Sequence, residues 1–153
     1  MNGHLRQLAT LINVLGLTPS LLEAQSRQTS QAAVYLAKQL GLDLGYNFSW
    51  QSAGPYSSRL TEDLYDLASG PTTILPYRLN EDFTRRTERI LRLFAVPRGV
   101  TLDESRWLLL LAATHFLVTH ARISQPEMER RLRSVDAQIS RYGEEAKNVL
   151  AAA

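Results

Sequence analysis

The sequence predicts a mainly α-helical fold with one small two-stranded sheet. Apolar residues recur at helical spacing over most of the chain, whereas residues 46–51 and 72–79 have the composition of short strands. Glycines and prolines separate these segments. With 153 residues and 44% hydrophobic content, the chain is long enough to bury its own core, so we expect one compact domain over residues 1–153. Residues 1–100 should hold helices and the sheet, with the helices of residues 101–153 packed on them.

Three helices are predicted before the first strand. Residues 4–16 carry apolar side chains at helical spacing and end at a glycine. A short helix is expected to start after Thr18, because Pro19 suits the first turn of a helix. Residues 30–41 are apolar on nearly every side. A helix without a solvent-exposed polar face is expected in the middle of a core.

The stretch 46–67 is expected to organise the fold around a corner. Aromatic residues alternate with polar ones at its start, which would place the aromatic side chains on one buried face of a strand. A glycine and a proline follow and are expected to turn the chain, and a serine then caps a helix with leucines at positions 60, 64 and 67. The residues of this structural corner are Tyr46, Phe48, Trp50, Gly54, Pro55 and Ser57.

The C-terminal half is predicted to be helical throughout. Residues 81–95 should bury one side and expose arginines on the other, and residues 103–121 form a second deeply buried helix. Ser124 and Glu127 have the spacing of a capping box for a basic helix that runs to about Val135. The buried side of the first of these helices is expected to comprise Phe83, Ile90, Leu91 and Phe94.

Composition excludes several classes of protein. There is no cysteine, so a disulfide scaffold, a thiolate metal site and a cysteine nucleophile are excluded. No run reaches the roughly 18 apolar residues of a membrane span. The N-terminus does not have the pattern of a signal peptide, so a cytoplasmic location is expected.

The sequence contains no common catalytic or metal-binding motif: GxSxG, a glycine-rich phosphate loop and HExxH are all absent. His115 and His120 would lie about 140° apart on a regular helix, so they do not converge on a metal ion. We expect His115 in the core or at an interface, bonded to a partner group. The prediction is a protein that is not an enzyme, with no cofactor, catalytic residue or metal site.

One function hypothesis is nucleic-acid binding by the arginines of residues 81–95. Guanidinium groups at helical spacing can follow a phosphate backbone. The alternative is a solvated face partly neutralised by Glu81, Asp82 and Glu88, and it stays open. The candidate nucleic-acid-binding residues are Arg85, Arg86, Arg89 and Arg92.

The other hypothesis is binding to a second protein. Its basis is the free edge expected of a small sheet, the aromatic side chain beside the corner, and an acidic helix surface opposed to arginine-rich helices. A partner encoded by a neighbouring gene is one candidate, and association between copies of this chain stays open. The candidate partner-binding residues are Tyr56, Arg59, Glu62, Asp63 and Asp66.

The pattern of Tyr46, Phe48 and Trp50 followed by the Gly-Pro-Tyr-Ser corner resembles small bacterial and archaeal proteins of the YwgA-like type. It is similar, more distantly, to the C-terminal domain of the antitoxin paired with DNA ADP-ribosyltransferase toxins. The helical segments that contain residues 34–36 and 107–117 extend the resemblance. Two positions differ: Gln51 stands where a second aromatic residue is usual, and alanines stand where a lysine usually precedes residue 34.

The resemblance implies a winged-helix-like fold in a regulatory or antitoxin-related protein, without an established catalytic residue set. The first reading is therefore a protein-binding module that is regulatory, antitoxin-like or part of a prokaryotic defence assembly. The alternative is a winged-helix-like transcriptional regulator that binds nucleic acid through its arginine-rich helix.

Overall fold

The computed structural model describes residues 3–17, 24–69 and 81–153. Over these residues the fold is mainly α-helical with a small antiparallel two-stranded sheet, as the sequence predicts. The elements are α1 (Gly3–Val14), α2 (Ala24–Gln39), β1 (Ser49–Gln51), β2 (Gly54–Tyr56), α3 (Ser58–Ser69), α4 (Glu81–Leu93), α5 (Glu104–Phe116), the π-helix η1 (Leu117–Ala121), α6 (Gln125–Val135), the 3₁₀-helix η2 (Ile139–Tyr142) and α7 (Gly143–Ala152).

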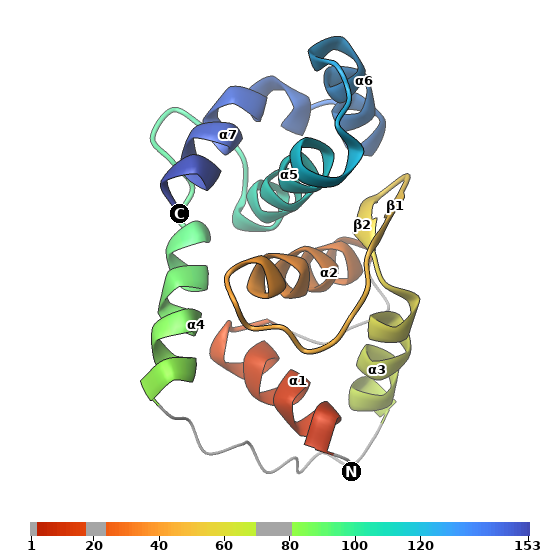
Figure 1. The fold of residues 1–153 in the computed structure, drawn as a ribbon, viewed down its shortest axis with the longest axis vertical. Helices are drawn as coiled ribbons and strands as arrows, with labels where there is room; N and C mark the ends of the chain where they lie inside the picture. The colour runs from red at the N-terminus through yellow and green to blue at the C-terminus, as the bar shows by residue number, and fades with distance from the viewer. Residues whose placement is uncertain (1–2, 18–23, 70–80) are drawn as a thin grey trace.

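Helix α2 lies in the middle of the molecule, with α1 on one side and α5 on the other (Figure 1). Its residues 31–37 are all buried, which confirms the central position predicted for residues 30–41. The helix begins earlier than predicted, at Ala24, so the polar residues before position 30 are helical as well. Beyond its end, Gly41 has a φ of +99°, a conformation that favours glycine and stops a helix.

Helix α5 is the second deeply buried helix, as predicted, and its residues 107–114 are all buried against α2 and α7. Asp103 caps it by accepting a 2.8 Å hydrogen bond from the backbone N–H of Arg106. The indole N–H of Trp107 donates a 2.9 Å hydrogen bond to the backbone C=O of Leu93. This bond joins the start of α5 to the end of α4, and it satisfies the polar atom of a completely buried ring.

The two described strands form a hairpin, and the predicted place of the turn is wrong. The turn lies at Ser52 and Ala53, and the glycine and proline expected to turn the chain form β2 instead, with Pro55 opposite Trp50. Because β1 and β2 are adjacent in the sequence, their pairing closes only a short loop and loses little chain entropy. Gly54 has a φ of +103°, which lets the chain enter β2 directly from the turn. The expected strand at 72–79 lies outside the described residues.

The predicted aromatic face is buried only in part. Tyr46 is fully buried but precedes β1, which begins at Ser49. Phe48 and Trp50 are half-buried and pack against the core from its edge. Of the side predicted to be buried on α4, Leu91 is exposed instead, because α4 lies at the periphery and covers the core with a narrow stripe.

The remaining C-terminal elements follow the predicted order with one addition. Ser124 caps α6 by accepting a hydrogen bond from the N–H of Glu127, and the helix ends at Val135 as predicted. The 3₁₀-helix η2 is an element that the sequence did not predict. The short helix expected after Thr18 lies outside the described residues. The winged-helix-like detail, which the resemblance implies, stays a prediction.

Candidate functional site

Helix α3 carries the surface predicted to bind a partner. Arg59, Glu62 and Asp66 are exposed on the side of the helix opposite its buried leucines. Asp63 has a different role, since its carboxylate accepts a 2.7 Å hydrogen bond from the hydroxyl of Tyr46. Burial, and then this hydrogen bond, raise the pKa of the Tyr46 hydroxyl, so it remains a donor. Asp63 therefore holds the chain before β1 in place.

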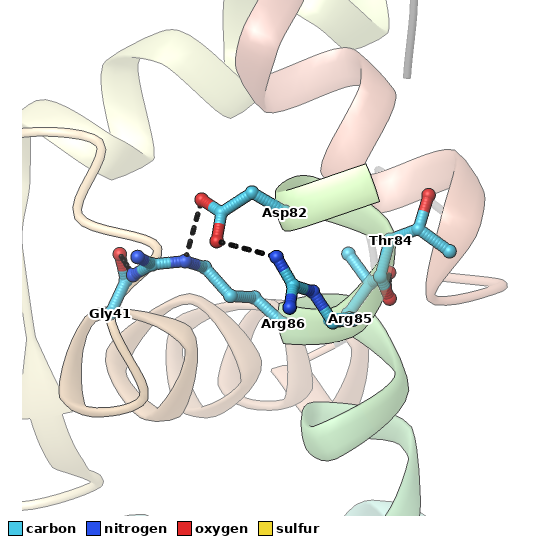
Figure 2. Close-up of polar contacts among 6 residues, drawn as sticks. Gly41, Asp82, Thr84, Arg85 and Arg86 are labelled. Carbon is cyan, nitrogen blue, oxygen red and sulfur yellow. Dashed lines mark hydrogen bonds and ion pairs between the residues drawn. The ribbon is translucent and has the colours of Figure 1, made fainter. Parts of the chain in front are cut away.

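Helix α4 carries the arginines predicted to bind nucleic acid, and Figure 2 shows the contacts of two of them, Arg85 and Arg86. Arg86 donates a 2.6 Å hydrogen bond to the backbone C=O of Gly41 and a 2.9 Å bond to the carboxylate of Asp82. Arg85 is at 3.9 Å from the same carboxylate. Arg86 thus ties α4 to the segment after α2, and its guanidinium group is already engaged within the fold.

Arg89 and Arg92, one turn further along α4, are exposed. The structure gives neither of them an ion pair with any described carboxylate, in contrast to Arg85 and Arg86. Both line a cavity between α4 and the end of α7. Of the four arginines predicted to act together, only these two share one unneutralised surface.

The structure also brings together an aromatic cluster that the sequence reasoning did not predict. The rings of Trp50 and Phe116 lie 5.8 Å apart, and those of Phe116 and His120 lie 5.0 Å apart. Phe48 meets Tyr35 edge to face at 5.3 Å. We name Phe48, Trp50, Phe116 and His120 the aromatic cluster. Tyr56, the remaining residue predicted to bind a partner, is half-buried at the end of β2 in the same hairpin.

The π-helix positions the cluster at the end of α5. Its wider turn changes the direction of the side chains after Phe116, so the separation of about 140° expected between His115 and His120 on a regular helix does not apply. Its end is marked by Arg122, which has a φ of +48°. Because His120 extends from this π-helix, its ring lies against Phe116 at the surface.

His115 is half-buried and has the bonded partner that the sequence predicts. Its Nδ1 atom lies 2.8 Å from the hydroxyl of Tyr35 and is hydrogen bonded to it. Burial, and secondarily the neighbouring His120, lower the pKa of His115. The imidazole is therefore neutral at pH 7 and joins α2 to α5 as a structural group.

Two further features concern metal binding and membrane insertion of the described residues. They contain no group of three or more histidine, aspartate or glutamate side chains that could hold a metal ion. No helix among them is long and apolar enough to cross a membrane.

Comparison with known proteins gives no relative from which a function could be transferred. No family model, no curated protein and no solved structure matches this chain. The resemblance to YwgA-like proteins and to the antitoxin domain stays a prediction. One signal for the aromatic cluster was present in the sequence: Phe116 and His120 are four residues apart, at helical spacing.

Proposed function

We propose that this protein is a non-enzymatic protein-binding module, and that an extended segment of its partner adds to the hairpin beside β1. The observation that carries the proposal is the position of Trp50. Its ring belongs to the aromatic cluster, and its backbone lies in the edge strand of a small sheet. One residue therefore offers both main-chain hydrogen bonds and an apolar contact.

The backbone of Trp50 supports strand addition. Trp50 faces Pro55 across the hairpin. Because proline has no N–H, this pair cannot exchange two hydrogen bonds, so it takes the non-hydrogen-bonded position of the antiparallel ladder. The N–H and C=O of Trp50 then point away from β2. Among the described strands only β2 pairs with β1, so these groups are open to a third strand.

The side chains around Trp50 support an apolar contact beside that edge. Phe116 and His120 continue the aromatic cluster from Trp50, and His120 is exposed. Aromatic residues are enriched at protein interfaces, where a half-buried ring adds contact area at little cost in side-chain entropy. A partner strand beside β1 would cover these side chains with its own.

The resemblance supports a narrower form of the proposal. In this form the module is regulatory, antitoxin-like or part of a prokaryotic defence assembly, it acts in the cytoplasm, and its partner is the product of a neighbouring gene. The exposed acidic residues of α3 would then add an electrostatic contact at the rim of the interface, which mainly affects the association rate. Association between copies of this chain through the same edge is the competing outcome.

The test is co-purification of the tagged chain with the products of its neighbouring genes. His120→Asp places a negative charge in the aromatic cluster and should abolish retention of the partner. Glu88→Lys, at an exposed site on α4, is the matched control and should leave retention unchanged. Equal retention by both variants, or retention of nothing beyond the chain itself, would overturn the proposal. A defined oligomer of this chain lost in His120→Asp would identify self-association.

Hydrogen exchange tests the strand addition separately. The amide of Trp50 should exchange rapidly in the free protein and slowly in the complex, because only an added strand would hydrogen bond it. The amide of Glu88 should exchange at the same rate in both. Unchanged exchange at Trp50 in a stable complex would show that the partner binds without adding a strand.

Nucleic-acid binding by α4 is the second candidate, and the exposure of Arg85, Arg89 and Arg92 favours it. Reading of bases by α2 is not supported, since the Gln31 side chain is buried and Lys38 donates to the backbone C=O of Tyr46. Binding would then be to phosphates and should fall steeply with salt. Arg89→Ala/Arg92→Ala should weaken retention on duplex DNA more than Arg133→Ala on α6. Absence of any shift of DNA at low salt would exclude this candidate.

A further inference from the structure

A cavity of about 340 Å³ lies where the end of α2, the second half of α4 and the end of α7 meet. In Figure 1 the end of α4 and the C-terminal end of α7 lie close together at one side of the molecule. Leu40 from the segment after α2, Leu93 from α4, and Val149 and Ala152 from α7 form its walls. The volume is within the range of small-molecule sites, at its lower end.

Two arginines of α4, Arg89 and Arg92, are the polar part of this otherwise apolar lining. They are three residues apart, so their side chains emerge from the same side of the helix. Arg85 and Arg86, one turn earlier, share the carboxylate of Asp82, whereas Arg89 and Arg92 have no carboxylate within ion-pair distance in the described part of the chain. Two unneutralised positive charges thus lie beside an apolar hollow.

We propose that this cavity binds a small amphiphilic carboxylate, such as a medium-chain fatty acid. The carboxylate would pair with Arg89 and Arg92, whose planar groups suit bidentate hydrogen bonds to it. The hydrocarbon chain would lie against Leu40, Leu93 and Val149 and be removed from water.

The charge balance of the cavity favours an anion. Helix α7 ends at its rim, and the C-terminal end of a helix carries roughly half a negative charge. Arg89 and Arg92 are the charged side chains of the lining, and their two positive charges exceed this partial charge. A nucleic-acid backbone would satisfy the arginines but would leave the apolar walls unfilled. The combination of charge and apolar wall therefore selects an acid with a hydrocarbon body.

Calorimetric titration with decanoate, below the concentration at which it forms micelles, tests the proposal. Decanoate should bind, whereas decanol, which lacks the charge, and acetate, which lacks the hydrocarbon, should bind at least about tenfold more weakly. Equal binding of decanol and decanoate, or no binding of decanoate, would overturn the proposal.

Variants locate the site. Arg89→Gln/Arg92→Gln should weaken decanoate binding by about tenfold or more. Arg85→Gln is the matched control on the same helix and should change it by no more than about twofold. Ala152→Trp fills the cavity without altering the arginines and should also abolish binding. Unchanged affinity in the double variant or in Ala152→Trp would show that decanoate binds elsewhere, and melting curves establish that each variant is folded.

The two tryptophans give an internal reporter. The indole N–H of Trp107 donates to the backbone C=O of Leu93, and Leu93 lines the cavity. The indole signal of Trp107 in ¹H–¹⁵N spectra should move on addition of decanoate. The signal of Trp50, in the hairpin, should stay in place. Movement of Trp50 alone would assign decanoate to the aromatic cluster and contradict the proposed site.

Discussion

The side-chain amide of Gln31 is hydrogen bonded to both backbone groups of Ser57. Its oxygen accepts from the Ser57 N–H at 2.9 Å, and its nitrogen donates to the Ser57 C=O at 3.1 Å and to the hydroxyl of Thr61 at 2.9 Å. The Ser57 hydroxyl in turn accepts from the N–H of Leu60 and caps α3, as the sequence predicts. A residue of α2 thus fixes the point at which the hairpin passes into α3.

Replacing Gln31 should therefore be costly. Gln31→Leu leaves the buried N–H of Ser57 without a partner, whereas the Ser57 C=O keeps its bond from the N–H of Thr61. We expect the free energy of unfolding to fall by about 1–3 kcal/mol. Urea denaturation measures it. Gln39→Leu, at a half-buried position near the end of the same helix, is the control and should change stability by no more than about 0.5 kcal/mol. Similar losses for both would mean that the Gln31 bonds contribute little.

Gly54→Ala should destabilise through backbone and packing together. Gly54 has a φ of +103°, and an added Cβ would lie 3.1 Å from Cδ1 of Leu109. Gly45 has a φ of +88° with nothing within 4 Å of the same atom, so Gly45→Ala reports the backbone strain alone, about 1–2 kcal/mol. We expect Gly54→Ala to cost about 1 kcal/mol more than Gly45→Ala in thermal or urea unfolding. Equal losses of unfolding free energy in the two variants would show that Leu109 of α5 shifts to accommodate the added methyl group.

Stability should fall on mild acidification because of His115. Its pKa is lowered in the folded state by burial and by His120, so the unfolded chain binds this proton more readily. The stabilisation is complete above the ordinary histidine pKa of about 6.5 and is lost as the pH falls through the lowered pKa of the folded state. His115→Gln keeps an acceptor for Tyr35 but cannot titrate. Its unfolding free energy should vary less with pH in this window, and identical slopes would contradict the assignment.

Arg86→Ala should destabilise the protein more than Arg85→Ala. Arg86 bonds to the C=O of Gly41 and to Asp82, and its side chain is 37% exposed, whereas Arg85 is 73% exposed and 3.9 Å from Asp82. We expect a loss of about 1–2 kcal/mol for Arg86→Ala and of no more than about 0.5 kcal/mol for Arg85→Ala. Urea denaturation of the two variants compares them directly. A larger loss at Arg85 would mean that α4 is not held by the contact with Gly41.

Parts of the candidate site could be predicted from the sequence and parts could not. The exposed positions of Arg59, Glu62 and Asp66 follow from helical periodicity, because the leucines of α3 define the opposite face. The function of Asp63 could not be foreseen, since its partner Tyr46 lies before the hairpin and only the folded chain brings the two together. The aromatic cluster also joins residues far apart in the sequence, in β1 and at the end of α5.

Most of the helices, the caps at Ser57 and Ser124, and the buried segments of α2 and α5 could be derived from the sequence alone. These features depend on residues within a few positions of one another, through side-chain periodicity and local hydrogen bonds. Three features are seen only in the folded chain. Gly54 enters a strand, and a π-helix follows Phe116. Arg86 bonds to Gly41 and Asp82, whereas Arg89 and Arg92 line a cavity. Each of these features depends on contacts between segments that are distant in the sequence, and the energies of such contacts cannot be predicted from local sequence patterns.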